Sequence, residues 1–154
     1  MIQVYIFLDI DGVLNCKADW NKPYTINNKC LDNFVKLCKD LSKKYGVVKI
    51  VLTSSWKEGF DIKGNNSPQI TGLLHKLNIY GLVISDKTMS VSGKSRQDEI
   101  EYYIRRNGIN DYIILDDDKS LYTDISKVNI YITDYLTGLT DKDTKKVLKQ
   151  VKRR

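Results

Sequence analysis

The sequence predicts an α/β fold in which helices cover both sides of a parallel sheet of about five strands. Short apolar runs recur along the 154 residues, and segments with apolar residues at helical spacing separate them. This alternation is the pattern of parallel βαβ units. Three of the apolar runs are followed directly by polar residues, as expected at the carboxyl ends of parallel strands. We therefore expect a doubly wound sheet in a single domain spanning residues 1–154.

The first half of the chain is expected to supply two strands and two helices. The apolar run at 4–8 predicts a strand, and an irregular stretch at 15–26 follows it. A helix is predicted over 28–45, because its apolar residues recur at helical spacing between an Asn27 or Asn28 cap and Gly46. A buried strand at 47–52, a loop at 57–67 and a helix at 68–77 come next.

The second half repeats the pattern. The predicted elements are a strand at 82–85, a helix from a Ser95 cap through Asn107, strands at 112–115 and 128–132, and a helix from about Asp141. No gap between these elements is long enough for a sizeable cap domain. The whole arrangement is Rossmann-like.

Composition excludes several classes of protein. Hydrophobic residues make up 42% of the chain, enough for a core, but no stretch approaches the roughly 20 apolar residues of a membrane span. The first apolar run has no basic residues before it and ends at Asp9, so it does not read as a signal peptide. Three cysteines without C-x-x-C spacing and one histidine argue against zinc. Reduced thiols in a cytoplasmic protein are expected.

The net charge of +6 is concentrated at the carboxyl terminus. Residues 141–154 hold seven Lys or Arg against two Asp, so they carry +5 of that charge. A basic terminus can attract a polyanion such as RNA. It can equally be the solvated face of a last helix, and the thin apolar stripe of this segment favours that interpretation.

Four polar clusters are predicted to gather at one edge of the sheet. They are Asp9/Asp11 in the D-x-D-G turn, Thr53 to Ser55, Asp116 to Asp118, and Lys94/Arg96 at the start of a helix. Phosphoryl transfer needs an in-line nucleophile, a cation on the phosphoryl oxygens and donors for the remaining charge. Several carboxylates this close repel one another, and a divalent cation relieves the repulsion. The clusters therefore predict a Mg²⁺-assisted phosphoryl-transfer site.

The sequences of these motifs resemble those of the haloacid dehalogenase (HAD) phosphatase superfamily. The matching segments are D-I-D-G-V-L-N from Asp9, T-S-S-W from Thr53, G-K-S-R-Q-D-E-I from Gly93 and I-L-D-D-D from Ile114. Together with G-L-T from Gly138, they look most like the HAD domains of Swiss Army Knife RNA repair proteins. They are more distantly similar to the phosphatase half of phage polynucleotide kinase–phosphatase.

The resemblance implies a role for each matched residue. Asp9 is expected to be the nucleophile that forms an aspartyl-phosphate, and Asp11 the general acid and then the general base. Thr53 is expected to bind a phosphoryl oxygen, with the Ser54 backbone nearby. Mg²⁺ is expected on Asp9, the Asp11 carbonyl, Asp116 and Asp117.

Three further assignments are less fixed by the resemblance. The active-site cation is Arg96 or Lys94, with Arg96 preferred because its spacing to the E-I pair fits these relatives. Lys57 stands where the relatives tend to show Arg, which suggests a substrate contact beside Trp56. Trp56, Trp20 and Tyr24 are expected either to pack in the core or a lid, or to stack on bases.

The missing cap favours an open site, which suits a phosphate at the end of a large molecule. The favoured hypothesis is a phosphatase that removes terminal phosphates from RNA or DNA ends. The alternatives are a phosphatase for nucleotides or sugar phosphates, and a non-catalytic nucleic-acid-binding module. The sequence leaves open which phosphate is removed, whether separate kinase or ligase components take part, and whether the chain is a monomer.

Overall fold

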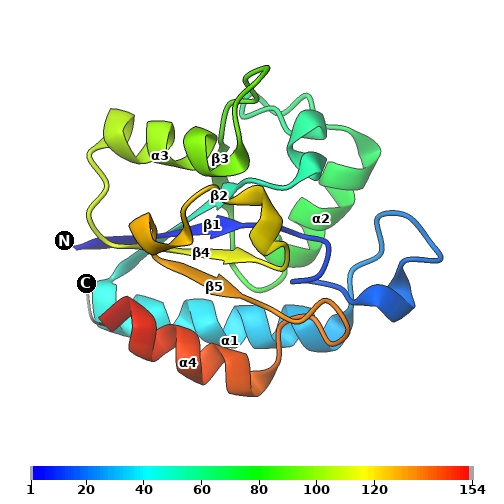
Figure 1. Cartoon of the computed structure of the whole chain (residues 1–154). Helices are drawn as coiled ribbons and strands as arrows, with labels where there is room; N and C mark the ends of the chain where they lie inside the picture. Colours follow the sequence, from blue (N-terminus) through cyan, green and yellow to red (C-terminus); the bar gives the residue numbers. More distant parts are fainter. Residues whose placement is uncertain (1, 153–154) are drawn as a thin grey trace.

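The structure, a computed structural model, describes residues 2–152 and is built around a five-stranded parallel sheet (Figure 1). The strands are β1 (Gln3–Leu8), β2 (Val47–Leu52), β3 (Ile84–Lys87), β4 (Tyr112–Asp116) and β5 (Ile130–Ile132). Their order across the sheet is β3-β2-β1-β4-β5, and every neighbouring pair is parallel. The first strand therefore lies at the centre, and its carboxyl end falls where the order of strands reverses.

Four α-helices within residues 2–152 connect and flank the strands. They are α1 (Asn28–Tyr45), α2 (Pro68–Asn78), α3 (Arg96–Asn107) and α4 (Asp141–Lys152). The side chain of Asn27 caps α1 by accepting from the amides of Lys29 and Cys30. Ser95 caps α3 in a capping box with Asp98, which makes Arg96 the first residue of that helix.

The two faces of the sheet bury different sets of side chains. Alternate residues of β1 point to opposite faces, as the period of a strand requires. Ile6 and Leu8 belong to the larger core, which α1, α2 and α4 cover, whereas Phe7 belongs to a smaller core beneath α3. The doubly wound α/β fold is thus confirmed, and in residues 2–152 no connection between strands holds a cap domain.

The two edge strands differ from the predicted ranges. The third strand begins at Ile84 rather than at residue 82, and its register with β2 shifts between Ile50 and Val51. The fifth begins at Ile130 rather than at residue 128, because Val128 closes a short 3₁₀ turn by donating to Ile125. An edge strand pairs on one side only, so local turns can displace its ends.

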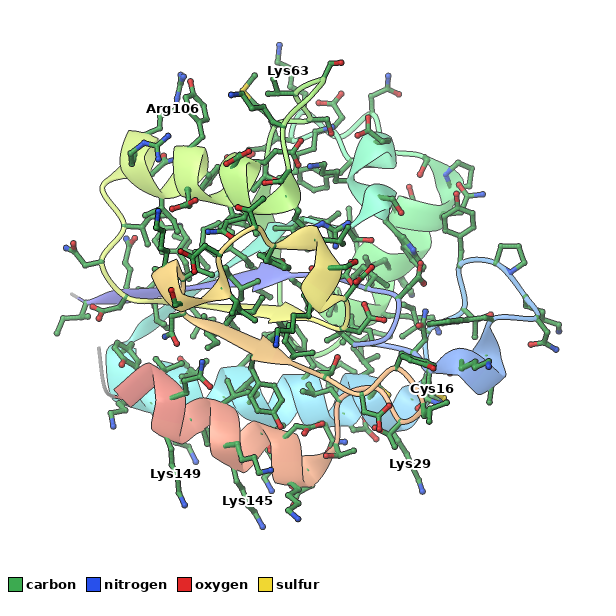
Figure 2. All side chains as sticks on the ribbon, in the orientation of Figure 1. Cys16, Lys29, Lys63, Arg106, Lys145 and Lys149 are labelled. Carbon is green, nitrogen blue, oxygen red and sulfur yellow. The ribbon has the colours of Figure 1, made fainter. Side chains whose placement is uncertain are left out.

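The basic last helix packs on α1 through its apolar stripe. Val147 and Val151 are buried, and Figure 2 shows Lys145 and Lys149 projecting outward from the molecule. The helix ends beside Tyr45, whose hydroxyl donates to the Val151 carbonyl, at the edge where the strands begin (Figure 1). The carboxyl end of the helix therefore lies at the opposite edge of the sheet from the predicted site, whereas the helix begins toward the edge to which the strands point (Figure 1).

No helix within residues 2–152 combines the length and apolar character needed to cross a membrane.

Candidate active site

The carboxyl ends of β1 and β4 bring two buried aspartates onto one arginine. Asp9 directly follows β1, and its amide donates to the Leu115 carbonyl at 3.0 Å, which extends the sheet ladder and fixes its backbone. The Arg96 Nη1 atom lies 3.1 Å from Asp9 Oδ1 and 2.9 Å from Asp116 Oδ2. Burial opposes the charge of the guanidinium, but the two carboxylates outweigh it and raise the pKa of Arg96. Arg96 therefore stays charged between them.

Asp116 is held by three donors and has no exposure to solvent. Besides Arg96, the Tyr122 hydroxyl donates to Oδ2 at 2.7 Å, and the Asp118 amide donates to Oδ1 at 3.0 Å. Burial, and then the Asp116 charge, raise the pKa of Tyr122, so the phenol remains a donor. A buried carboxylate with this many donors is fixed in one orientation.

The third carboxylate, Asp117, lies close to Asp9. Burial raises the pKa of Asp117 to about 6, and burial followed by the Asp116 charge raises the pKa of Asp9 well above its ordinary range. The close approach depends on Gly12, which has a φ of 84° and whose missing Cβ would collide with the Asp117 carboxylate. Gly12 thus serves both the turn and the packing of the carboxylate cluster.

These residues fit a divalent cation. One carboxylate oxygen from each of Asp9, Asp116 and Asp117 lies within 4.8 Å of the others. Of the residues lining the cleft of about 450 Å³ around them, Arg96 alone is basic. One guanidinium offsets one of three carboxylate charges, so the cluster retains an excess of negative charge and an all-oxygen donor set of the kind Mg²⁺ prefers. The raised pKa values of Asp9 and Asp117 are the consequence of that excess together with burial.

The Asp11 carboxylate is oriented by two donors. Asn15 Nδ2 donates to Oδ1 at 2.9 Å, and Trp56 Nε1 donates to Oδ2 at 3.2 Å. Asn15 is itself buried, and its Oδ1 accepts from the Gly12 amide and from Trp20 Nε1, each at 2.9 Å. The Asn15 side chain is therefore hydrogen-bonded to the Gly12 turn, to the Asp11 carboxylate and to the Trp20 indole.

Thr53 carries a buried hydroxyl that lacks a partner. Its amide donates to the Leu8 carbonyl at 2.9 Å, which sets Thr53 beside Asp9 at the end of the adjacent strand. Its Oγ1 is the one side-chain polar atom of residues 2–152 that is buried without a hydrogen bond. A buried unsatisfied hydroxyl costs about 1–3 kcal/mol. A phosphoryl oxygen bound at Asp9 would satisfy it.

Ser54 and Trp56 lie in the turn that follows Thr53. The Ser54 side chain caps a short 3₁₀ helix at Ser55–Gly59 by accepting from the Trp56 amide at 3.2 Å. Trp56 is buried with its indole nitrogen on Asp11. This turn was expected to be loop from residue 57 onward, but its helical geometry directs Lys57 inward.

The structure places neither Lys57, the predicted substrate contact, nor Lys94, the alternative cation, at the carboxylate cluster. Lys57 Nζ lies 3.0 Å from Glu99 Oε1 and 3.1 Å from Thr88 Oγ1, and only 6% of the Lys57 side chain is exposed. Its donors are thus taken up by a buried ion pair rather than free for substrate. Lys94 precedes the first turn of α3 and lines a separate surface cavity, whereas Arg96 points at Asp9.

A family model described as the HAD domain in Swiss Army Knife RNA repair proteins matches residues 5–144. The chain belongs to this family. The match runs from β1 into α4 and includes all the residues of the carboxylate cluster. Searches of curated proteins and of solved structures each found no match.

Membership of the HAD family supports a hydrolase of the phosphatase kind. HAD domains generally use Mg²⁺, and the cluster of Asp9, Asp116 and Asp117 could hold one. Of the acidic residues predicted from sequence, the structure brings Asp9, Asp116 and Asp117 together, while the Asp11 and Asp118 side chains lie outside this three-carboxylate group. For Asp11 only the backbone carbonyl was expected on the metal.

Two residues that sequence reasoning did not assign take part in this HAD site. Asn15 stood inside the first motif, and the signal was a polar residue directly after the apolar pair Val13 and Leu14. Tyr122 gave no signal, because only the fold brings it back from the 3₁₀ turn after β4 onto Asp116.

Proposed function

We propose that this HAD domain is a Mg²⁺-dependent phosphomonoesterase that removes terminal phosphates from RNA or DNA ends through an aspartyl-phosphate at Asp9. One observation carries the proposal. Beside the unpaired Thr53 hydroxyl, Arg96 and Asp9 form an ion pair within a carboxylate cluster that has more negative than positive charge. Such a site is incomplete without a cation and an oxygen-bearing ligand.

Asp9 would act as the nucleophile. Its carboxylate oxygen attacks phosphorus while the bond from phosphorus to the leaving oxygen breaks, which gives an aspartyl-phosphate and an alcohol. Arg96 favours the ionised form of Asp9 that this attack needs, because its guanidinium lies 3.1 Å away. Mg²⁺ held by Asp9, Asp116 and Asp117 would offset the negative charge on the phosphoryl oxygens.

Asp11 would move the proton in both steps. It protonates the leaving oxygen in the first step, then takes a proton from the water whose oxygen attacks phosphorus and breaks the bond to Asp9. Asn15 and Trp56 each donate to a different Asp11 oxygen, so the carboxyl is held in one orientation throughout. Thr53 Oγ1 is available to donate to a phosphoryl oxygen, since nothing else in the described structure engages it.

Two observations support nucleic-acid ends as the substrate. The matching family model describes HAD domains of RNA repair proteins. The cleft around Asp9 also lacks a covering domain in residues 2–152, which allows a large molecule to reach it. The basic last helix adds no support, because none of its described residues lines this cleft.

The test is phosphate release in Mg²⁺ or EDTA from RNA and DNA oligonucleotides phosphorylated at the 3′ or 5′ end, with mononucleotides and sugar phosphates alongside. We expect metal-dependent release concentrated on oligonucleotide ends. The Asp9→Asn variant should lose about a thousandfold or more in rate, because it removes the nucleophile and preserves the shape. Asp118→Asn is the matched control, since Asp118 lines the same cleft but is exposed and stands outside the three-carboxylate group.

Full activity in Asp9→Asn would contradict the mechanism. Release from small phosphomonoesters alone would assign the enzyme to metabolite or nucleotide hydrolysis. Tight RNA binding with no release from any substrate would favour the non-catalytic binding module.

A further inference from the structure

A second cavity opens beside the phosphate site. Its volume is about 350 Å³, and its lining includes Asp11, Trp20, Lys22, Tyr24, Ser55 and Trp56. Asp11, Trp20 and Ser55 also line the cleft that contains Asp9 and Arg96. The two hollows are therefore adjacent, and the second lies at Asp11, where the leaving group of the proposed reaction would emerge.

Exposed aromatic side chains gather at the rim of these two hollows. Five aromatic side chains in residues 2–152 are exposed, and three of them, Trp20, Tyr24 and Tyr135, line one or both of the two adjacent hollows. Their exposed fractions are 42%, 54% and 44%. Exposed apolar surface gathered at one place indicates a binding surface, whereas scattered single residues do not.

The aromatic rings are held in place by contacts that leave their exposed faces open. The Trp20 indole N–H donates a hydrogen bond to Asn15 Oδ1, and the ring stacks on Tyr135 with centroids 6.0 Å apart. Tyr24 lies edge-on to Trp56 at 4.9 Å. The loop after β1 is bound to the loop after β5, since the Lys17 backbone amide donates to the Tyr135 carbonyl at 2.9 Å. Figure 1 shows both loops at the edge toward which the strands point.

Tyr24 adopts a costly backbone conformation to reach this position. Its φ of 61° makes it the one non-glycine residue of the described chain in the left-handed region. Such conformations are unfavourable for residues with a side chain and are found preferentially at ligand-binding positions. Half of the ring remains exposed, so burial in the core does not account for the cost.

We propose that this cavity, which we call the aromatic subsite, binds the nucleobase of the terminal nucleotide whose phosphate lies at Asp9. The inference rests on the proposed function, because the phosphate must occupy the neighbouring cleft. Aromatic side chains stack on any base, so the subsite selects for a nucleoside over a bare sugar and tolerates different base sequences. Lys22 on the same rim supplies a positive charge for the polyanionic strand.

The matched substrates for the test differ only in the base. One is a short RNA strand with a terminal phosphate, and the other carries the same phosphate on an abasic terminal residue. We expect the wild-type kcat/KM to be about tenfold or more higher with the base present, from the usual strength of base stacking on aromatic residues. In Trp20→Leu and Tyr24→Leu this ratio should fall toward one.

The control is Tyr80→Leu, because Tyr80 is as exposed as Trp20, at 41%, and belongs to neither hollow. It should keep the wild-type ratio. The ratio also separates stacking from a structural role: if Trp20→Leu acted only by loosening Asn15 and Asp11, both substrates would slow equally and the ratio would persist.

A binding measurement tests the subsite without turnover. Both tryptophans of the chain, Trp20 and Trp56, line the cavity, so their fluorescence reports its occupancy. We expect the phosphorylated strand to quench this fluorescence in EDTA at concentrations about tenfold lower than the abasic strand requires.

The outcomes distinguish the subsite from the proposed function. Equal kcat/KM for the two strands, together with equal quenching by both, overturns the subsite and leaves the proposed phosphatase function unaffected. Base-dependent quenching without phosphate release supports the subsite and overturns the proposed function. An unchanged ratio in both aromatic variants overturns the subsite.

Discussion

Two buried basic side chains near the carboxyl edge of the sheet, Lys57 and Arg96, have opposite relationships to their surroundings. The Lys57 ammonium faces one carboxylate, Glu99, and one hydroxyl, and both side chains of the ion pair are almost fully buried. Arg96 faces Asp9 and Asp116, and one Asp117 carboxylate oxygen lies within 4.8 Å of an oxygen of each. The charges around Lys57 balance, whereas those around Arg96 leave an excess of carboxylate.

This difference separates a structural ion pair from a reactive site. A buried pair that is complete within the protein has nothing left to bind and contributes to holding the fold. A cluster with surplus charge beside an unpaired Thr53 hydroxyl is stable only at a cost, and a bound cation and phosphate would remove that cost. Residue type and spacing did not distinguish the two cations; the charge balance around each does.

The largest effect is expected from breaking the balanced pair. Lys57→Met should lower the free energy of unfolding by about 3–5 kcal/mol, because it leaves the Glu99 carboxylate buried without its partner. Urea denaturation at constant Mg²⁺ measures this. The double variant Lys57→Met/Glu99→Gln should recover part of the loss. A loss under about 1 kcal/mol in the single variant would mean that the pair is not buried in solution.

The next largest effect is expected on activity, when the Arg96 charge is removed from the carboxylate cluster. Arg96→Met should lower kcat for phosphate release by about 10²–10³-fold, the usual result of removing one group that stabilises charge in the transition state. Lys94→Met is the matched control and should change kcat by less than about twofold. A larger loss of kcat in Lys94→Met than in Arg96→Met would identify Lys94 as the active-site cation. Circular dichroism in Mg²⁺ should show both variants folded.

The smallest effect concerns pH. Burial raises the pKa of Asp117 from 3.8 to about 6, so the metal-free fold favours the protonated form. The contribution of Asp117 to the stability of that fold is then fully present below about pH 4 and is lost as the pH rises through 6. Because Asp117 is only half-buried, solvent screening limits the effect to about 1 kcal/mol, or roughly 2–4 °C in Tm.

Thermal unfolding between pH 5 and 7.5 checks this expectation. In EDTA the Tm should fall across that range, and in saturating Mg²⁺ the fall should disappear because the cation compensates the ionised carboxylates. Asp117→Asn should flatten the EDTA profile. A Tm that rises with pH in EDTA would contradict the charge excess.

The sequence predicted the framework of the site because strand ends carry strong local signals. Asp9, Thr53 and Asp116 each stand at the carboxyl end of an apolar run, and parallel pairing then brings them together. The helix at Asn28–Tyr45 was predicted closely, since Gly46 marks its end and an asparagine its start; the structure selects Asn27 over Asn28 as the cap. The edge strands were placed less well, because one-sided pairing lets adjacent turns decide where they begin.

The direction of side chains could not be predicted in the same way. Ser95 as the cap fixes Arg96 as the first helical residue, and only the packing of α3 against the sheet then aims it at Asp9. Lys57 follows Trp56 in sequence, but a single 3₁₀ turn sends one residue to Asp11 and the other to Glu99. Tyr122 reaches Asp116 through a turn that has no motif.

The most direct test of the central claim is calorimetric titration of the protein with Mg²⁺ alone, which compares neighbouring aspartates by the same substitution. We predict binding of one Mg²⁺ per chain in the wild type, at least tenfold weaker binding in Asp117→Asn and unchanged binding in Asp118→Asn. Only Asp117 of these two belongs to the three-carboxylate group. An absence of Mg²⁺ binding in the wild type, or equal weakening in the two variants, would contradict the claim that the charge excess around Arg96 is a metal site.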